Sequence, residues 1–86
     1  MRYSIEITKK ASKALLRIPS KTQRRIIDEI WSLALYPFPN KCKKLVGRRA
    51  WRIRVGDYRV IYEVFSRRVL IVVLLIGQRK SIFGRK

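Results

Sequence analysis

The sequence predicts an α+β domain with the order β-α-α-β-β-β, in which two N-terminal helices pack on one face of a mainly antiparallel four-stranded sheet. Two segments with apolar residues at helical spacing come first, and a series of β-rich segments follows. A Gly-Asp pair at positions 56–57 lies between two of these segments, as in a tight hairpin. The 86 residues, 48% of them hydrophobic, are enough for one small domain with a core, so we expect a single domain over residues 1–86.

The N-terminal part is predicted to form one strand and two amphipathic helices. Apolar and polar residues alternate over 3–7, which indicates a strand with one buried face. Thr8 is a suitable N-cap for a helix that extends to about Arg17. Ser20 and Gln23 have the spacing of a capping box and predict a second helix, which the prolines at 37 and 39 end. The side chains expected to face the core are Ala11, Ala14, Leu15 and Ile18 from the first helix, and Ile26, Ile27, Ile30, Trp31, Leu33 and Ala34 from the second.

The C-terminal part is predicted to form three strands in series. The first begins near Trp51, the second spans about Tyr58 to Phe65, and the third spans about Arg68 to Gly77. Residues 69–76 are apolar at every position, which is typical of a strand covered on both faces. We therefore expect this last strand to lie in the middle of the sheet.

The two-residue loop at Gly56-Asp57 fixes the register of the hairpin and places Arg54 directly opposite Arg59. Like charges opposed across strands destabilise a sheet by roughly 0.2–1 kcal/mol, so this pair favours an anion site. Guanidinium groups bind phosphate oxygens in a bidentate manner, although long arginine side chains can also simply keep a sheet face hydrated. In this register the core face carries Trp51, Ile53, Val55, Tyr58, Val60 and Tyr62, and the opposite face carries Arg52, Arg54 and Arg59.

The charge composition favours a polyanionic partner. The chain has 22 Lys and Arg against 5 Asp and Glu, a net charge of +17, which nucleic acid would neutralise, as would an acidic protein. A stretch without acidic residues holds much of the excess: Lys41, Lys43, Lys44, Arg48, Arg49, Arg52 and Arg54.

Several functional classes are excluded by composition. The chain has no histidine, so it contains no Ser-His-Asp or Cys-His catalytic arrangement. The single cysteine, Cys42, cannot form an internal disulfide or build a zinc site alone, and we expect neither a metal nor a cofactor. No apolar run approaches the roughly 18 residues of a membrane-spanning helix, and the N-terminus does not have the pattern of a signal peptide. We therefore expect a cytoplasmic protein with no membrane partner.

Three sequence segments resemble the RelE toxins of type II toxin–antitoxin systems. They are K-L-V-G at 44–47, W-R-I-R-V-G-D-Y-R-V-I-Y-E-V at 51–64 and I-G-Q-R-K-S-I-F at 76–83. The resemblance covers nearly the whole chain, including the order of the elements, and the central segment is typical of the RelE/ParE superfamily.

This resemblance implies a RelE-like fold and a ribosome-dependent endoribonuclease, an mRNA interferase that cuts mRNA in the A site of a 70S-type ribosome. A cognate acidic antitoxin would hold the enzyme inactive. In that family, basic residues on the sheet hold the scissile phosphate, and the matching positions here are Arg52, Arg54, Arg59 and Arg79. Phe83 stands where the family often has a tyrosine, and Gln78 stands where it often has a histidine.

These two departures leave few groups for proton transfer, because guanidinium is not deprotonated in proteins. Lys80, Lys44 and Glu63 remain, and Lys80 is the leading candidate, since neighbouring cations lower the pKa of a lysine. The predicted catalytic residues are Arg52, Arg54, Arg59, Arg79 and Lys80, and the predicted RNA-binding residues are Lys41, Lys43, Lys44, Arg48, Arg49 and Phe83.

Two alternatives are compatible with the same residues. The first is a ParE-like toxin that inhibits DNA gyrase without catalysing a reaction. The second is a catalytically weakened module that binds RNA or the ribosome.

Overall fold

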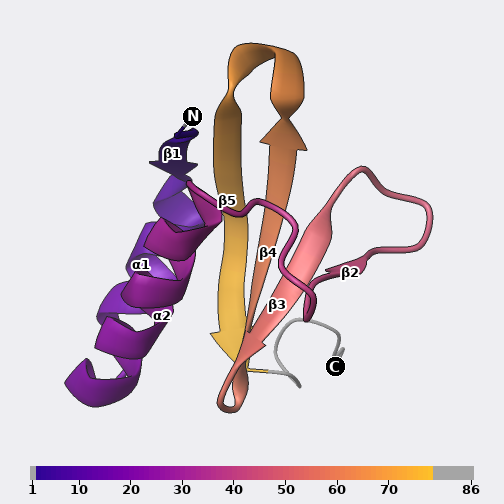
Figure 1. Ribbon diagram of the computed structural model, residues 1–86. Helices are drawn as coiled ribbons and strands as arrows, with labels where there is room; N and C mark the ends of the chain where they lie inside the picture. The colour runs from indigo at the N-terminus through magenta and orange to yellow at the C-terminus, as the bar shows by residue number, and fades with distance from the viewer. Residues whose placement is uncertain (1, 79–86) are drawn as a thin grey trace.

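The computed structural model describes residues 2–78 and contains a five-stranded sheet with two α-helices (Figure 1). The helices are α1 (Lys9–Leu16) and α2 (Ser20–Leu33), and a short 3₁₀ turn, η1, spans Ser66–Arg68. The strands are β1 (Ser4–Ile7), β2 (Lys43–Lys44), β3 (Trp51–Val55), β4 (Tyr58–Phe65) and β5 (Leu70–Gln78).

The strands are ordered β1-β5-β4-β3-β2. β1 runs parallel to β5, and the other neighbouring strands are antiparallel. The predicted α+β class and the order of the long elements are confirmed. The apolar last strand, β5, is internal, between β1 and β4, although the middle strand is β4. The sheet has five strands rather than four because the two-residue β2, too short to show a periodicity, adds to the edge of β3.

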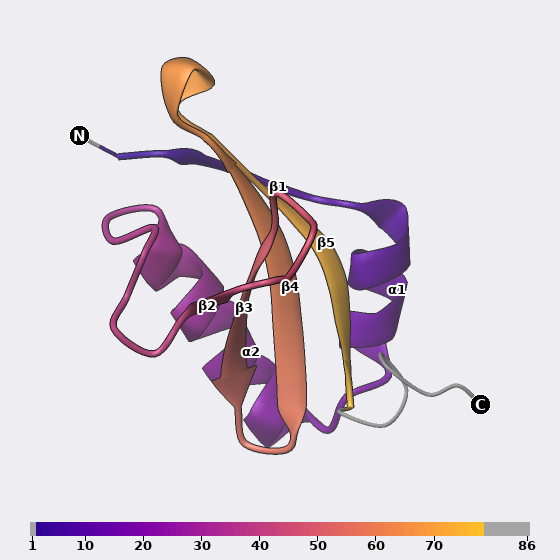
Figure 2. The ribbon, with the colours of Figure 1, turned by 90° about the vertical axis from the view of Figure 1, so that its right-hand side faces the viewer.

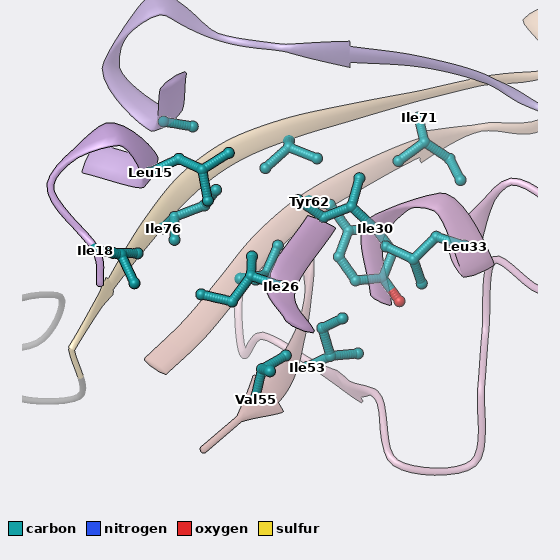
Figure 3. Packing of buried hydrophobic residues seen from close by; sticks show 13 residues of the cluster. Leu15, Ile18, Ile26, Ile30, Leu33, Ile53, Val55, Tyr62, Ile71 and Ile76 are labelled. Atoms are coloured by element: carbon teal, nitrogen blue, oxygen red, sulfur yellow. The ribbon is translucent and has the colours of Figure 1, made fainter. Parts of the chain in front are cut away.

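Both helices cover one face of the sheet, and among the described residues no helix covers the other face (Figure 2). Figure 3 shows Ile26, Ile30 and Leu33 of α2 near Tyr62 and Ile53 of the sheet. These five side chains are at most 2% exposed, so the interior between α2 and the sheet is fully packed. The sheet face without helices is where the arginines were predicted.

Thr8 joins the start of α1 to β5. Its Oγ1 accepts a hydrogen bond from the Ala11 amide at 3.1 Å, which confirms the predicted N-cap. The same hydroxyl donates to the Leu74 carbonyl oxygen at 2.9 Å. Leu74 is the extra residue of a bulge in β5: its neighbours Val73 and Leu75 pair with consecutive residues of β4, and Leu74 itself has no partner there. This bulge lets both Val73 and Ile76 reach the core.

Two predictions about α2 were wrong. No side chain caps its N-terminus, where Pro19 precedes the first turn, and Gln23 Nε2 instead donates to the Leu15 carbonyl oxygen at 2.8 Å. Trp31 is 60% exposed rather than buried, because Ile30 and Leu33 fill the side of the helix that meets the sheet.

The last strand begins later than predicted. Residues 66–68 form η1, and Val69 follows with φ 50°, in the left-handed region that a β-branched side chain rarely adopts. Regular pairing with β4 therefore starts at Leu70.

Candidate functional site

The predicted register of the β3–β4 hairpin is confirmed at every position. Arg54 pairs with Arg59, and Arg52 pairs with Ile61. Gly56 has φ 61°, which opens the two-residue turn and which glycine adopts without strain. Because directly paired residues point to the same side of a sheet, the three arginines lie on the face without helices.

β2 adds another cation to this face. Lys43 pairs with Arg52, so a second like-charged pair lies beside the Arg54–Arg59 pair. Opposed residues on neighbouring strands are only about 4.5–5.5 Å apart, so each pair concentrates two positive charges. We call the set Lys43, Arg52, Arg54 and Arg59 the cationic face.

The members of the cationic face differ in accessibility. Lys43 and Arg54 are exposed, Arg52 is half-buried, and Arg59 is only 9% exposed. In residues 2–78, no carboxylate lies within ion-pair distance of Arg52 or Arg54. Arg54 is thus the arginine of the Arg54–Arg59 pair that can reach an external anion directly, while Arg59 is buried beside it on β4.

Gly77 lies at one end of the cationic face. It pairs with Arg59 across β4 and β5, so the row that contains Arg54 and Arg59 ends at a residue without a side chain.

Glu63 lies on the same face, two positions beyond Ile61 on β4. It pairs with Val72, whose partner on the other side is Glu6 of β1. Two carboxylates therefore flank one valine at the end of this face that is remote from the hairpin turn. This face is basic toward the turn and acidic toward β1.

Two of the predicted RNA-binding lysines point elsewhere. Lys41 Nζ lies 2.9 Å from Oε1 of Glu29 on α2. Lys44 pairs with Trp51, and its Nζ lies 6.0 Å from the centre of the indole ring, on the side of the sheet that faces the helices. This position separates Lys44 from the cationic face and makes it unsuitable as a base there.

The loop between β2 and β3 holds the other predicted RNA-binding residues that the structure describes. Arg48 and Arg49 are exposed and help to line a hollow of about 480 Å³ formed by residues 44–49. The Leu45 amide donates to the Ala50 carbonyl oxygen at 2.9 Å, which closes the loop. The remaining predictions, Arg79, Lys80 and Phe83, lie outside the described residues.

Tyr62 does not replace the tyrosine that position 83 lacks. It is fully buried on the helix side, and its hydroxyl donates to the Pro37 carbonyl oxygen at 2.8 Å. Burial raises the pKa of Tyr62 above its usual 10.0, and the nearby Cys42 raises it further. The phenol is therefore neutral and structural, on the face opposite the arginines.

Sequence reasoning missed the place of Lys43 in the sheet. A weak signal existed, because Cys42, which packs against the core, lies between the exposed cations Lys41 and Lys43. Within residues 2–78 no group of His, Cys, Asp or Glu is arranged to bind a metal ion. None of the helices in this range has the length and apolar character needed to cross a membrane.

Comparison with known proteins shows the family. A family model described as the ParE toxin of type II toxin–antitoxin systems, parDE, matches residues 5–83. The curated RelE1 protein of Methanocaldococcus jannaschii is 28% identical over 87 residues, which cover 96% of this chain and 97% of that protein.

Solved structures agree with this match. The RelE–RelB complex from Pyrococcus horikoshii OT3 contains a chain with 34% identity and a TM-score of 0.83, with full coverage of both chains. The isolated RelE toxin of E. coli has the same fold, with a TM-score of 0.78 at 19% identity, over 98% of this chain and 87% of that one. The chain therefore belongs to the ParE toxin family, within the RelE/ParE superfamily of type II toxin–antitoxin toxins.

Proposed function

We propose that this toxin is a ribosome-dependent endoribonuclease that cuts mRNA in the ribosomal A site, and that it acts in the cytoplasm. The observation that supports the proposal is the cationic face, where two like-charged pairs lie side by side on a sheet face that no helix of residues 2–78 covers. Each opposed pair costs roughly 0.2–1 kcal/mol in the absence of an anion. A phosphate between the side chains would convert this repulsion into attraction.

The cationic face suits one part of RNA cleavage. When a 2′-hydroxyl attacks the adjacent phosphate, negative charge builds up on the phosphate oxygens, and preorganised cations stabilise it. Arg54 is exposed and would contact these oxygens, while the buried Arg59 would add positive potential. Arg52 and Lys43 would bind the next stretch of the RNA backbone.

Proton transfer needs a group other than an arginine. We propose Lys80, with Arg79 as a further phosphate ligand and Phe83 as a stacking surface for a base. Glu63 is a less suitable base, because it lies beyond the Ile61 position and nearer to Glu6 than to the Arg54–Arg59 pair. The ribosome would supply the order of the mRNA.

We further propose that an acidic antitoxin binds and inhibits this chain. The related toxins of Pyrococcus horikoshii and Methanococcus jannaschii were crystallised as complexes with RelB antitoxins. A net charge of +17 opposes compaction of the isolated toxin, and an acidic chain would relieve this repulsion.

The second candidate function is inhibition of DNA gyrase without catalysis. The observation in its favour is that the matching family model is that of the ParE toxin. A gyrase inhibitor needs a protein-binding surface and no base, which suits a chain without histidine.

The decisive experiment compares Arg54→Ala with Arg67→Ala in translating ribosomes. Both variants lose one positive charge, but Arg67 lies in η1, at the other end of the β4 strand from the hairpin turn (Figure 1). We expect Arg54→Ala to lower the rate of A-site cleavage by about 10²–10³-fold, because one charge-stabilising donor is lost. The Arg67→Ala variant should cleave within twofold of the wild type.

Equal losses in the two variants would show that overall charge, rather than the cationic face, matters. A wild-type protein that leaves mRNA intact but traps gyrase on DNA would establish the second candidate. Arg59→Ala is a poorer probe, since removal of a buried side chain also disturbs packing.

A further inference from the structure

The C-terminal end of α2 carries an exposed apolar surface that the proposed nuclease site does not use. Trp31 is 60% exposed and Leu35 is 51% exposed. Together with Arg2, Ser32 and Ala34 they line a hollow of about 490 Å³. We call these five residues the Trp31 patch.

The Trp31 patch lies in the least basic part of the chain. From Ile26 to Asn40 the sequence contains neither lysine nor arginine, although 22 such residues occur among the 86. Asp28, which is exposed, precedes Trp31 by one helical turn. Arg2, from the segment before β1, is the one cation among the patch residues.

An exposed tryptophan beside an exposed leucine calls for a partner. Exposed apolar side chains that lie together are typical of interaction sites, and tryptophan is among the residues that contribute most to binding at interfaces. The hollow gives an inserted apolar side chain contacts on several sides. The patch thus has the chemistry of an anchor point.

Charge distinguishes three kinds of partner for the Trp31 patch: nucleic acid, a second copy of the chain, and an acidic protein chain. Nucleic acid is disfavoured, because its phosphates would meet Asp28 and a single patch cation, Arg2. A second copy is disfavoured, because each chain carries +17. An acidic chain with apolar side chains is complementary: its carboxylates find cations over most of the toxin, including Arg2 at the hollow, and its apolar residues find the Trp31 patch.

We propose that the Trp31 patch binds an apolar segment of the antitoxin, at a site separate from the cationic face. This inference rests on the proposed antitoxin partner, and not on the nuclease activity. α2 lies behind the sheet when the cationic face is viewed from the front (Figure 2), so the Trp31 patch belongs to a helix on the other side of the sheet from the cationic face. The antitoxin would then hold the toxin at two independent places, and anchoring at one raises its effective concentration at the other.

The test uses the full-length toxin and the antitoxin encoded beside its gene, with the dissociation constant measured by calorimetry. We expect Trp31→Ser to weaken binding at least tenfold, and Leu35→Ser to weaken it several-fold. The matched control is Leu16→Ser, since Leu16 is 78% exposed at the end of α1, close to the start of α2 and remote from the patch. It should bind within twofold of the wild type.

Other readouts separate this inference from the proposed function. Cleavage of mRNA by the variants without antitoxin should equal that of the wild type, and the thermal midpoints should remain within a few degrees. If the wild type does not cleave mRNA but Trp31→Ser still weakens antitoxin binding, the nuclease proposal fails and the anchor remains.

Four outcomes would contradict the proposal that the Trp31 patch binds the antitoxin. The first is an unchanged dissociation constant for Trp31→Ser, and the second is an equal loss for Leu16→Ser. The third is a wild-type dimer, seen by sedimentation, that Trp31→Ser dissociates. The fourth is loss of RNA binding in Trp31→Ser, which would make the patch a stacking surface for bases.

Discussion

Tyr62 and Arg59 are both buried in β4, on opposite faces of the sheet. Tyr62 brings a hydroxyl into the apolar layer beneath α2 and bonds it to the Pro37 carbonyl oxygen. Arg59 brings a permanent charge to the other face, beside Arg54. One buried polar residue thus ties the segment after α2 to the sheet, and the other contributes to the candidate site.

The raised pKa of Tyr62 predicts a loss of stability at high pH. The unfolded chain ionises this phenol near its usual pKa of 10.0, while the folded chain keeps it neutral. The contribution of neutral Tyr62 to the free energy of unfolding is therefore complete below pH 10. As the pH rises further, the free energy of unfolding falls, at a slope that approaches about 1.4 kcal/mol per pH unit.

Urea denaturation of the wild type and of Tyr62→Phe between pH 8 and pH 11 tests this. At pH 8 the variant should be less stable by about 1 kcal/mol, because the hydrogen bond is lost. This difference should shrink toward pH 11, because only the wild type loses stability through ionisation of Tyr62 in the unfolded chain. Titration of the lysines affects both proteins equally. A difference that stays constant would contradict the pKa shift.

At the scale of elements, the hydrogen bonds of Thr8 connect α1 with the bulge of β5. One hydroxyl caps the helix and also occupies a carbonyl oxygen that the bulge frees from the sheet ladder. The start of α1 is thereby fixed against the strand that pairs with both β1 and β4.

We expect Thr8→Ala to lower the free energy of unfolding by about 1–2 kcal/mol, through loss of the cap and of the bond to Leu74. For a domain of this size each kcal/mol lowers the melting temperature by roughly 4–8 °C, which calorimetry resolves. Thr8→Ser keeps the hydroxyl and should retain most of the stability. If both variants lose equally, the methyl group rather than the hydroxyl carries the effect.

At the scale of the whole molecule, positive charge is unevenly distributed. The cationic face and the β2–β3 loop are basic, whereas residues 26–40 contain no lysine or arginine and expose Trp31. The molecule therefore offers one side to a polyanion and another to apolar groups.

Salt should affect stability and RNA binding in opposite directions. Raising the ionic strength screens repulsion within a chain of charge +17, so the melting temperature should rise. Affinity for single-stranded RNA should fall, with a log–log slope of about −3 if the cationic face contacts four phosphates. Arg54→Ala should make this slope shallower by about 0.7. A slope near zero would show that RNA binding is not electrostatic.

Much of the fold could be predicted, because long elements carry periodic signals. The Gly56-Asp57 turn and the alternation around it fixed the hairpin, and with it the shared face of the three arginines. β2 could not be predicted from two residues. The face of each residue follows from strand parity, but the depth at which Arg59 lies depends on what covers it.

The errors at α2 have a physical cause as well. Helical spacing shows where the apolar arc is centred but not how wide a surface the sheet offers, so Trp31 was placed inside although Ile30 and Leu33 already fill the contact. A capping box requires the Gln23 side chain to turn back and accept from the amide of Ser20, whereas in the structure this side chain donates to the Leu15 carbonyl oxygen. Composition carries no direction, so it does not show that Lys41 lies beside Glu29 or that Lys44 lies on the side of the sheet that faces the helices.

The pairing of β1 with β5 has a consequence for how the toxin is made. Every other described element precedes β5 in the chain, yet β5 lies between β1 and β4 and contacts α1. A nascent chain that has emerged only as far as η1 lacks the strand that joins its first strand to the hairpin, so the hydrophobic interior cannot close. The toxin would gain its harmful form only when synthesis has passed Gln78, which leaves a translating cell an interval in which a partner can capture the unfinished polypeptide.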